Sequence, residues 1–317
     1  MKHAAVSSMP RRGLLPLLVA AAVASCAGAP PKPAAPADAG VFFDDFSQPD
    51  LAALVRGGWT VRDKVGHPGI EGAHWGPGAV SLVDDPARRG NRLLRLTART
   101  DGTPAGTVQA QLCHARKVLE GTYAARVRFS DVPVQGRDGD VLIQTFYTVS
   151  PLRFDFDPEY SELDWEYLPN GGWGDARTRL YGVTWQTVRL NPWSAHNQPL
   201  QHFGALGGWH VLMMQVAAGR TRYFLDGAQL DEHGGRNHPV VPMAIAFSQW
   251  FAPGGQLPGA GDTRVYEEDV DWVFHARNRV MTPAEVEAAV QGLRRNGQAA
   301  VDTVPAAEPP LASTCDF

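Results

Sequence analysis

The sequence predicts an all-β sandwich or barrel in one domain, followed by one short helix. Between residues 41 and 276, short segments of alternating apolar and polar residues recur between clusters of Gly, Pro, Asn and Asp, the pattern of strands joined by turns. Long helical periodicity is missing from this stretch, and the 317 residues include 33 Gly and 25 Pro, a content typical of a turn-rich chain. Many short strands at this spacing favour the sandwich class.

Residues 1–26 have the pattern of an export signal. Arg11 and Arg12 precede an apolar run at 14–23, and small residues lead to Cys26. The Val-Ala-Ser-Cys ending resembles the lipobox of bacterial lipoproteins, and the Arg pair resembles a twin-arginine signal. This resemblance implies a lipid on Cys26 and a place in the bacterial cell envelope, with the lipid as the only membrane contact. Plain secretion is the alternative.

The remaining elements follow in order along the chain. A Pro- and Ala-rich tether covers residues 27–40, where nothing favours burial. Residues 41–276 form the predicted β domain, and 277–317 a helix and a loose tail. The helix begins at Thr282, with Pro next and Glu285 completing a capping box. Expected strands lie at 91–97, 123–129, 141–149, 161–168, 210–216, 221–226, 243–247 and 264–274.

The net charge limits the expected binding partners, and the cysteine content limits the expected disulfides. The chain has 29 Lys and Arg against 33 Asp and Glu, a net charge of −4, so we expect no nucleic-acid partner. Once Cys26 carries a lipid, Cys113 and Cys315 remain. In an oxidising compartment they form a disulfide or stay as two unpaired thiols, and the sequence leaves both open. We expect a monomer.

The segment 160–168 carries the strongest chemical signal. On a strand, Glu162, Asp164 and Glu166 share one face, while Leu163, Trp165 and Tyr167 share the buried one. Like charges at this spacing raise one another's pKa and weaken the strand. The two Glu Cα atoms lie about 13 Å apart, so their leaning side chains bring the carboxylates to roughly 5–6 Å, the separation used by retaining glycosidases. A solvated acidic face is the alternative.

Several motifs in order resemble glycoside hydrolase family 16, the retaining β-glucanases that include lichenases and laminarinases. Residues 162–166, Glu-Leu-Asp-Trp-Glu, fit the family signature Glu-(Ile/Leu/Val)-Asp-x-Glu without an inserted residue. Further similarities lie at 121–129, 208–227, 242–250 and 270–273. The resemblance covers about residues 41–276 and implies a concanavalin-like β-jelly roll.

By this resemblance, Glu162 is the nucleophile, Glu166 the acid/base and Asp164 the assisting carboxylate. It implies an endo-acting retaining hydrolase of a β-linked polysaccharide, most simply β-1,3- or β-1,3-1,4-glucan. A transglycosylase, a non-catalytic carbohydrate-binding protein and a surface structural protein are the alternatives. No cofactor is expected for catalysis. By the same resemblance, Arg126 and Trp250 are expected to line the substrate cleft. The aromatic residues after the signature add Trp173 and Trp185, whose rings are expected to stack against sugar rings.

Five further positions bear on that assignment. Asp271 lies where some family members bind a structural calcium ion, although a turn carboxylate is its ordinary interpretation. The family's Glu is replaced by Ala124, and its Asn by Ser248. Since both family residues commonly contact sugar hydroxyls, we do not expect lichenase specificity. His210 is expected to be structural rather than a base. Trp185 pointing into the core stays an alternative to the cleft.

Overall fold

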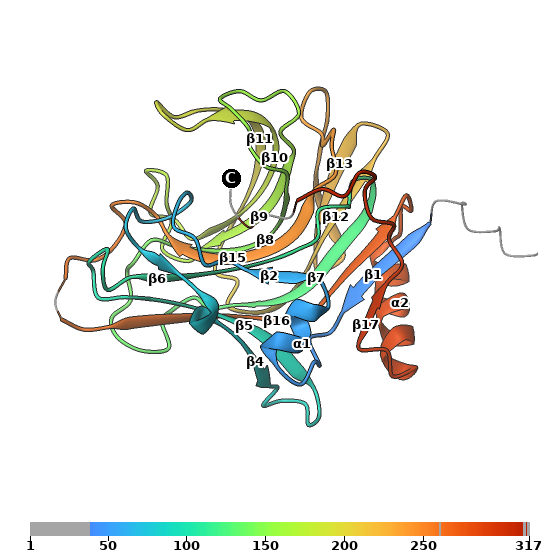
Figure 1. Cartoon of the computed structure of the whole chain (residues 1–317). Helices are drawn as coiled ribbons and strands as arrows, with labels where there is room; N and C mark the ends of the chain where they lie inside the picture. The colour runs from blue at the N-terminus through green and yellow to red at the C-terminus, as the bar shows by residue number, and fades with distance from the viewer. Residues whose placement is uncertain (1–38, 260, 313–314, 316–317) are drawn as a thin grey trace, which may run out of the picture. The chain divides into compact units, whose positions relative to one another are not determined.

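The structure is a computed structural model that describes residues 39–259, 261–312 and 315. The predicted export signal, Cys26 and all but the last two residues of the tether lie outside the described residues. The described chain forms two antiparallel sheets packed face to face, which we call the outer sheet and the cleft sheet (Figure 1). The predicted all-β sandwich is therefore confirmed. Within these residues, no helix is both long and apolar enough to cross a membrane.

The outer sheet is built around the long strand β16 (Arg264–Arg277). One side of β16 pairs with β5 and then β1, and its other side pairs with β7. Strands β4 and β17 lie beyond β5 and β1, and β12, β13 and β14 follow β7 in that order. The bounds are β1 Gly40–Asp44, β4 Val80–Asp84, β5 Arg92–Thr100, β7 Gly121–Phe129, β12 Gly208–Ala217, β13 Arg220–Leu225, β14 Ala228–His233 and β17 Ala300–Asp302.

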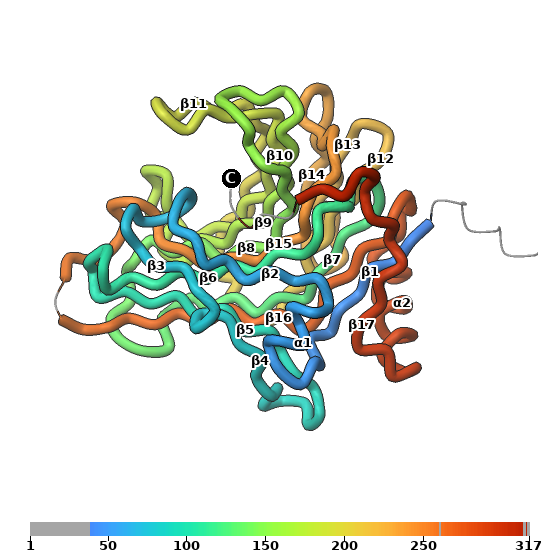
Figure 2. Tube along the Cα trace, in the orientation of Figure 1, coloured from blue at the N-terminus to red at the C-terminus, as the bar shows by residue number. Residues whose placement is uncertain are grey.

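The cleft sheet has the strand order β2-β6-β15-β8-β9-β10-β11. Strands β2 and β11 are thus its opposite edges. A register shift at Trp185–Thr187 interrupts the β10–β11 ladder, and such irregularities bend a hairpin. In Figure 2 this hairpin rises from the sheet and curves over it. The bounds are β2 Trp59–Val61, β6 Val108–His114, β8 Leu142–Val149, β9 Glu162–Leu168, β10 Arg179–Arg189, β11 Ser194–Phe203 and β15 Ala244–Phe251.

The main core lies between the two sheets. Leu163, Trp165 and Tyr167 of β9 are completely buried there and meet outer-sheet residues such as Tyr123 and Val127. Alternation along β9 therefore turns the intervening residues to the opposite face of the cleft sheet. The short elements that complete the described chain are α1 (Leu51–Arg56), β3 (His74–Trp75) and the 3₁₀ turn Pro77–Ala79.

The predicted C-terminal helix is α2 (Pro283–Arg295). Its capping box is complete, because the Thr282 hydroxyl accepts a hydrogen bond from the Glu285 backbone N–H and the Glu285 carboxylate accepts one from the Thr282 backbone N–H. Val286 and Val290 pack on the exterior of the outer sheet, against Phe274 and its neighbours. The helix thus covers the side of the outer sheet that faces away from the cleft sheet (Figure 1).

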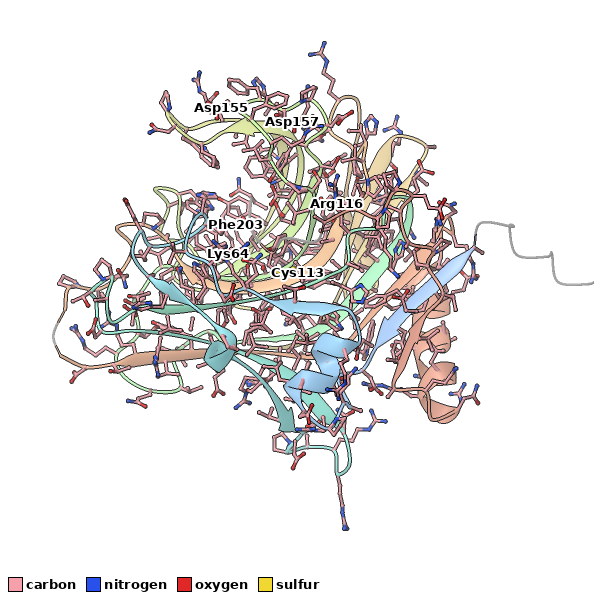
Figure 3. All side chains as sticks on the ribbon, in the orientation of Figure 1. Lys64, Cys113, Arg116, Asp155, Asp157 and Phe203 are labelled. Atoms are coloured by element: carbon pink, nitrogen blue, oxygen red, sulfur yellow. A yellow bond between two sulfur atoms is a disulfide. The ribbon has the colours of Figure 1, made fainter. Side chains whose placement is uncertain are left out.

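A disulfide joins Cys113 on β6 to Cys315 in the tail, across a sequence separation of 202 residues. Both cysteines are buried, and they pack with Tyr147 and Ala246 on the cleft side of the cleft sheet. The label on Cys113 in Figure 3 marks where this crosslink attaches. The tail, expected to be loose, is therefore tied to the sheet that carries the acidic residues.

Candidate active site

The acidic face of β9 forms the floor of a cleft of about 620 Å³. Glu162, Asp164 and Glu166 all line it, as alternation along the strand requires once the residues between them enter the core. We call these three residues the acidic trio. The other lining residues are His67, Pro68, Gly69, Thr145, Tyr147, Tyr160, Trp173, Tyr181, Val183, Trp185, Val188, Leu190, Trp193, Ala195, Asn197, Pro199, Ser248, Trp250 and Pro253.

Neighbouring strands surround the trio with uncharged side chains. Glu166 pairs across the sheet with Thr145 on β8 and Tyr181 on β10. Asp164 pairs with Tyr147 and Val183, and Glu162 with Val149 and Trp185. None of the described residues that line the cleft is Lys or Arg. The negative charge of the trio is therefore not compensated by a neighbouring guanidinium or ammonium group.

Hydrogen bonds hold two of the three carboxyl groups in place. The Tyr160 hydroxyl donates to Glu162 Oε2 over 2.5 Å, and Trp185 Nε1 donates to Asp164 Oδ2 over 2.5 Å. Glu162 and Asp164 also hydrogen-bond to each other, which requires a proton between the two carboxyl groups. Glu166 accepts neither of these bonds and is left available to a ligand in the cleft.

Burial raises the pKa of every member of the trio. It raises the pKa of Glu162 to about 8, against the hydrogen bond from Tyr160, with repulsion from Glu166 adding to the effect. Burial alone raises the pKa of Glu166 to about 7. Burial and the charges of both Glu residues raise the pKa of Asp164. At neutral pH the trio thus holds protons that can be exchanged with a substrate.

Aromatic side chains form the walls. Trp173, which is 54% exposed, lies with its ring centre 6.0 Å from that of the buried Trp250. On the opposite wall, Trp185 meets Trp193 edge-on at 6.1 Å. Trp173, Trp185 and Trp250 thus line the cleft as the sequence suggested, and Trp185 does not point into the core. Flat aromatic faces beside buried carboxyl groups suit the apolar faces of sugar rings.

The prediction that Arg126 lines the cleft is wrong. Arg126 lies on β7 in the outer sheet, where Val127 and its alternate neighbours enter the core, so its side chain points to the exterior. There it contacts Asp271 at 2.9 Å and stacks over Trp209 at 4.3 Å. Ala124 shares this exterior face, so the Glu that it replaces has no bearing on a substrate in the cleft.

The surroundings of Asp271 do not fit a calcium ion. Its carboxylate accepts hydrogen bonds from Asn91, Arg126 and Arg294, so an amide and two guanidinium groups already occupy the positions of the metal. Calcium requires six to eight oxygen ligands. The described residues hold no group of three or more His, Cys, Asp or Glu suited to a metal. His210 bonds to Asp226 at 2.7 Å and lies outside the cleft lining.

Tyr160 and His67 are two of the lining residues that the sequence motifs did not indicate. Tyr160 lies two positions before Glu162, and continuing the alternation of β9 by one step identifies it. His67 reaches the cleft from the loop after β2, and no local pattern signals this because the loop is distant from β9 in sequence. Ser248 does line the cleft, with its hydroxyl 2.8 Å from that of Thr145.

Comparison with known proteins supports the fold. No family model and no curated sequence matches the chain. Solved structures do match: a β-glucanase from Bacillus licheniformis (15% identity, TM-score 0.53) covers 74% of this chain and 97% of its own. A glycoside hydrolase family 16 endo-glucanase from Bacteroides ovatus (16%, 0.55) covers 73% and 98%. Porphyranase B from Zobellia galactanivorans (12%, 0.55) covers 74% and 90%. The chain has the fold of these family 16 glycoside hydrolases.

Proposed function

We propose that the protein is a retaining hydrolase that cuts internal bonds of a neutral β-linked polysaccharide, with a β-1,3- or mixed-linkage β-glucan as the favoured substrate. The observation that carries the proposal is the acidic trio on the floor of an aromatic cleft, with Glu162 and Asp164 buried and Glu166 half-buried. The similar fold of the family 16 endo-glucanase supports the reaction class. A structurally similar protein from Z. galactanivorans was solved in complex with laminaritriose and laminaritetraose, which supports a glucan.

The first step forms a covalent glycosyl-enzyme. Ionised Glu162 attacks the anomeric carbon, the glycosidic C–O bond breaks, and protonated Glu166 gives its proton to the departing oxygen. Asp164 takes the proton that it shares with Glu162, which leaves Glu162 ionised although burial raises its pKa to about 8, and the hydrogen bond from Trp185 holds Asp164 in place. The pKa of Glu166, raised to about 7 by burial, keeps this acid protonated in mildly acidic to neutral water.

The second step returns the enzyme to its starting state. Glu166, now ionised, removes a proton from water while the water oxygen attacks the anomeric carbon. The ester bond to Glu162 breaks and its carboxylate is released. Two inversions at one carbon leave the product with the β configuration of the substrate.

The lining also limits the substrate. Because no described residue of the lining is Lys or Arg, sulfated or carboxylated glycans would meet the negative trio without a compensating cation. Neutral hexose chains, which present C–H faces to Trp173, Trp185 and Trp250, avoid this repulsion. The predicted export signal stays a prediction.

The proposal is tested with Glu162→Gln on a panel of soluble β-glycans. The parent should release reducing sugar from a neutral β-glucan, with the β anomer appearing first by NMR. Glu162→Gln should lose about 10⁴-fold in kcat, since it removes the nucleophile. Glu159→Gln, an exposed carboxylate outside the cleft lining, is the control. Residual activity above a few percent in Glu162→Gln, or an α product, would overturn the assignment. Added acceptor sugar reveals transglycosylation.

A further inference from the structure

A chain of hydrogen bonds leads from a buried cation to the floor of the cleft. Arg62 directly follows β2 and is 3% exposed. Its Nη1 donates to Gln111 Oε1 on β6 over 2.9 Å, and Gln111 Nε2 donates to the Tyr147 hydroxyl on β8 over 2.6 Å. Gln111 and Tyr147 are buried as well. Of these three described residues, Tyr147 alone lines the cleft, so the chain ends at the cleft surface.

The fixed end of this chain is Arg62. Its Nε donates to the carbonyl of Lys64, which Figure 3 labels, over 2.8 Å, and its guanidinium lies over the Trp75 ring at 4.0 Å. The Arg62 backbone N–H donates to the Gln111 carbonyl. A guanidinium carries five donors, accepts no hydrogen bond and stays protonated at every working pH. Arg62 is therefore held in place and acts only as a donor.

The donor at Arg62 fixes the direction of every later bond in the chain. Because Arg62 only donates, Gln111 must present its carbonyl oxygen there, which turns its NH₂ group toward Tyr147. The opposite placement of the Gln111 amide would set two donors against each other. An amide NH₂ group only donates, so the Tyr147 oxygen must accept. The proton of the Tyr147 hydroxyl is then left for another acceptor.

Tyr147 keeps this proton beside the trio. Burial raises the pKa of Tyr147, and the charges of Glu162 and Asp164 add to the effect. Tyr147 pairs with Asp164 in the β8–β9 ladder, but within the described chain it forms no hydrogen bond to the carboxyl group of Asp164 or Glu162. Its one further partner there is the Ser248 hydroxyl, which has a proton of its own to donate. The Tyr147 proton is thus available to an acceptor on the substrate.

We propose that Tyr147 donates a hydrogen bond to a hydroxyl of the sugar that Glu162 attacks, and that Gln111 and Arg62 are positioning residues that orient this donor toward the cleft. This inference rests on the proposed function and adds to it a substrate contact beside the bond that is cut. Sugar hydroxyls both accept and donate, so a donor of fixed direction favours one orientation of the ring. A preorganised donor also needs no reorientation as charge develops at the reacting carbon.

The test reverses the direction of the chain at Gln111. In Gln111→Glu, the new carboxylate accepts from Arg62 and also from Tyr147, so the Tyr147 proton turns away from the cleft. On a soluble β-glucan that the parent hydrolyses, Gln111→Glu and Tyr147→Phe should each lower kcat/KM about tenfold, the effect of losing one hydrogen bond. In the Tyr147→Phe background, Gln111→Glu should cause an about fivefold smaller loss, because no hydroxyl proton remains to be turned. The added charge is present in both backgrounds, so the difference between the two losses reports the hydroxyl.

Two further variants complete the set. Gln111→Met removes both bonds of the glutamine without adding charge, and should lower kcat/KM about threefold while Tyr147 is present. It serves the same comparison if Gln111→Glu does not fold. Gln215→Glu, the same change at a buried glutamine on β12 whose amide donates to the Met281 carbonyl, is the matched control and should leave kcat and KM unchanged. Thermal unfolding checks that each variant folds.

Two results would overturn the inference while the hydrolase assignment stands. In the first, the folded Gln111 variants lose the same factor in kcat/KM with and without the Tyr147 hydroxyl, so the glutamine does not act through the tyrosine. In the second, Tyr147→Phe keeps the parental kcat/KM, so the Tyr147 proton serves Ser248 and not the substrate. If the parent hydrolyses no β-glycan, the proposed function is refuted and this inference with it.

Discussion

Two strands of this protein carry an acidic residue at every second position, but the surroundings of these residues differ. On β9 the residues are Glu162, Asp164 and Glu166, and on β16 they are Glu267, Asp269 and Asp271. These three β16 carboxylates face the exterior of the outer sheet, and each pairs with arginine, unlike the buried Glu268 between them. The ion pairs are Arg95 with Glu267 and Asp269, Arg128 with Asp269, and Arg126 and Arg294 with Asp271.

The pKa values follow this difference. Burial by itself raises the pKa of Asp271, but hydrogen bonds and charge from Arg294, with help from Asn91 and Arg126, outweigh burial and hold the pKa below its usual value. The trio has no such cations, and burial raises the pKa of all three carboxyl groups. The spacing of acidic residues therefore does not identify a catalytic strand. The residues on the neighbouring strands do.

The largest expected effect follows from removing the acid on β9. Glu166→Gln should lower kcat by about 10²–10⁴-fold, since no other group protonates the leaving oxygen. In the parent, activity should fall as pH rises through about 7, because burial raises the pKa of Glu166 to that value and the acid must be protonated. The pH–rate profile of Glu166→Gln should lose this alkaline limb. If the activity of the variant still falls as pH rises through about 7, another group is the acid.

A smaller effect is expected from breaking the paired carboxylate on β16. Asp271→Ala leaves Arg126 and Arg294 without their partner, and should reduce the free energy of unfolding at pH 7 by about 2–3 kcal/mol, discounted because Arg126 is partly exposed. Since its folded pKa is lowered, the stabilisation from Asp271 is present above about pH 4 and lost as pH falls below that value.

Urea unfolding measures this loss, with Asp84→Ala as the matched control. The Asp84 side chain is 95% exposed and 3.8 Å from Arg92, so its removal should change the free energy of unfolding little. Equal losses from both variants would show that the pairing on β16 does not set its stability. A large fall in kcat for Asp271→Ala would contradict a purely structural role.

The smallest expected effect concerns two tryptophans, one on each side of the molecule. Trp185→Phe keeps a ring in the cleft but loses the hydrogen bond to Asp164, and should lower kcat about tenfold with little change in KM, in line with the loss of one hydrogen bond. Trp209→Phe, below Arg126 on the exterior, should leave kcat unaltered. Equal kcat values for the two variants would show that Trp185 does not position the trio.

Much of this architecture was predictable from local patterns. Alternation identified the core and cleft faces of β9, and the capping box at Thr282 and Glu285 identified α2. Local patterns fail where two faces are chemically alike. Alternation on β7 groups Arg126 with Arg128, but both faces of a sandwich sheet obey the same period, so it did not show that these arginines face away from the cleft.

The sequence by itself determined the all-β class, the helix at its end, and the stacking of the acidic trio on one strand face, because these depend on periodicities of a few residues. Tertiary structure alone decided which sheet carries the cleft, which acidic strand receives arginines, and that Cys113 meets Cys315. It also brought His67 to Trp193. Such contacts join segments far apart in the chain, and only the packing of two sheets sets their distances.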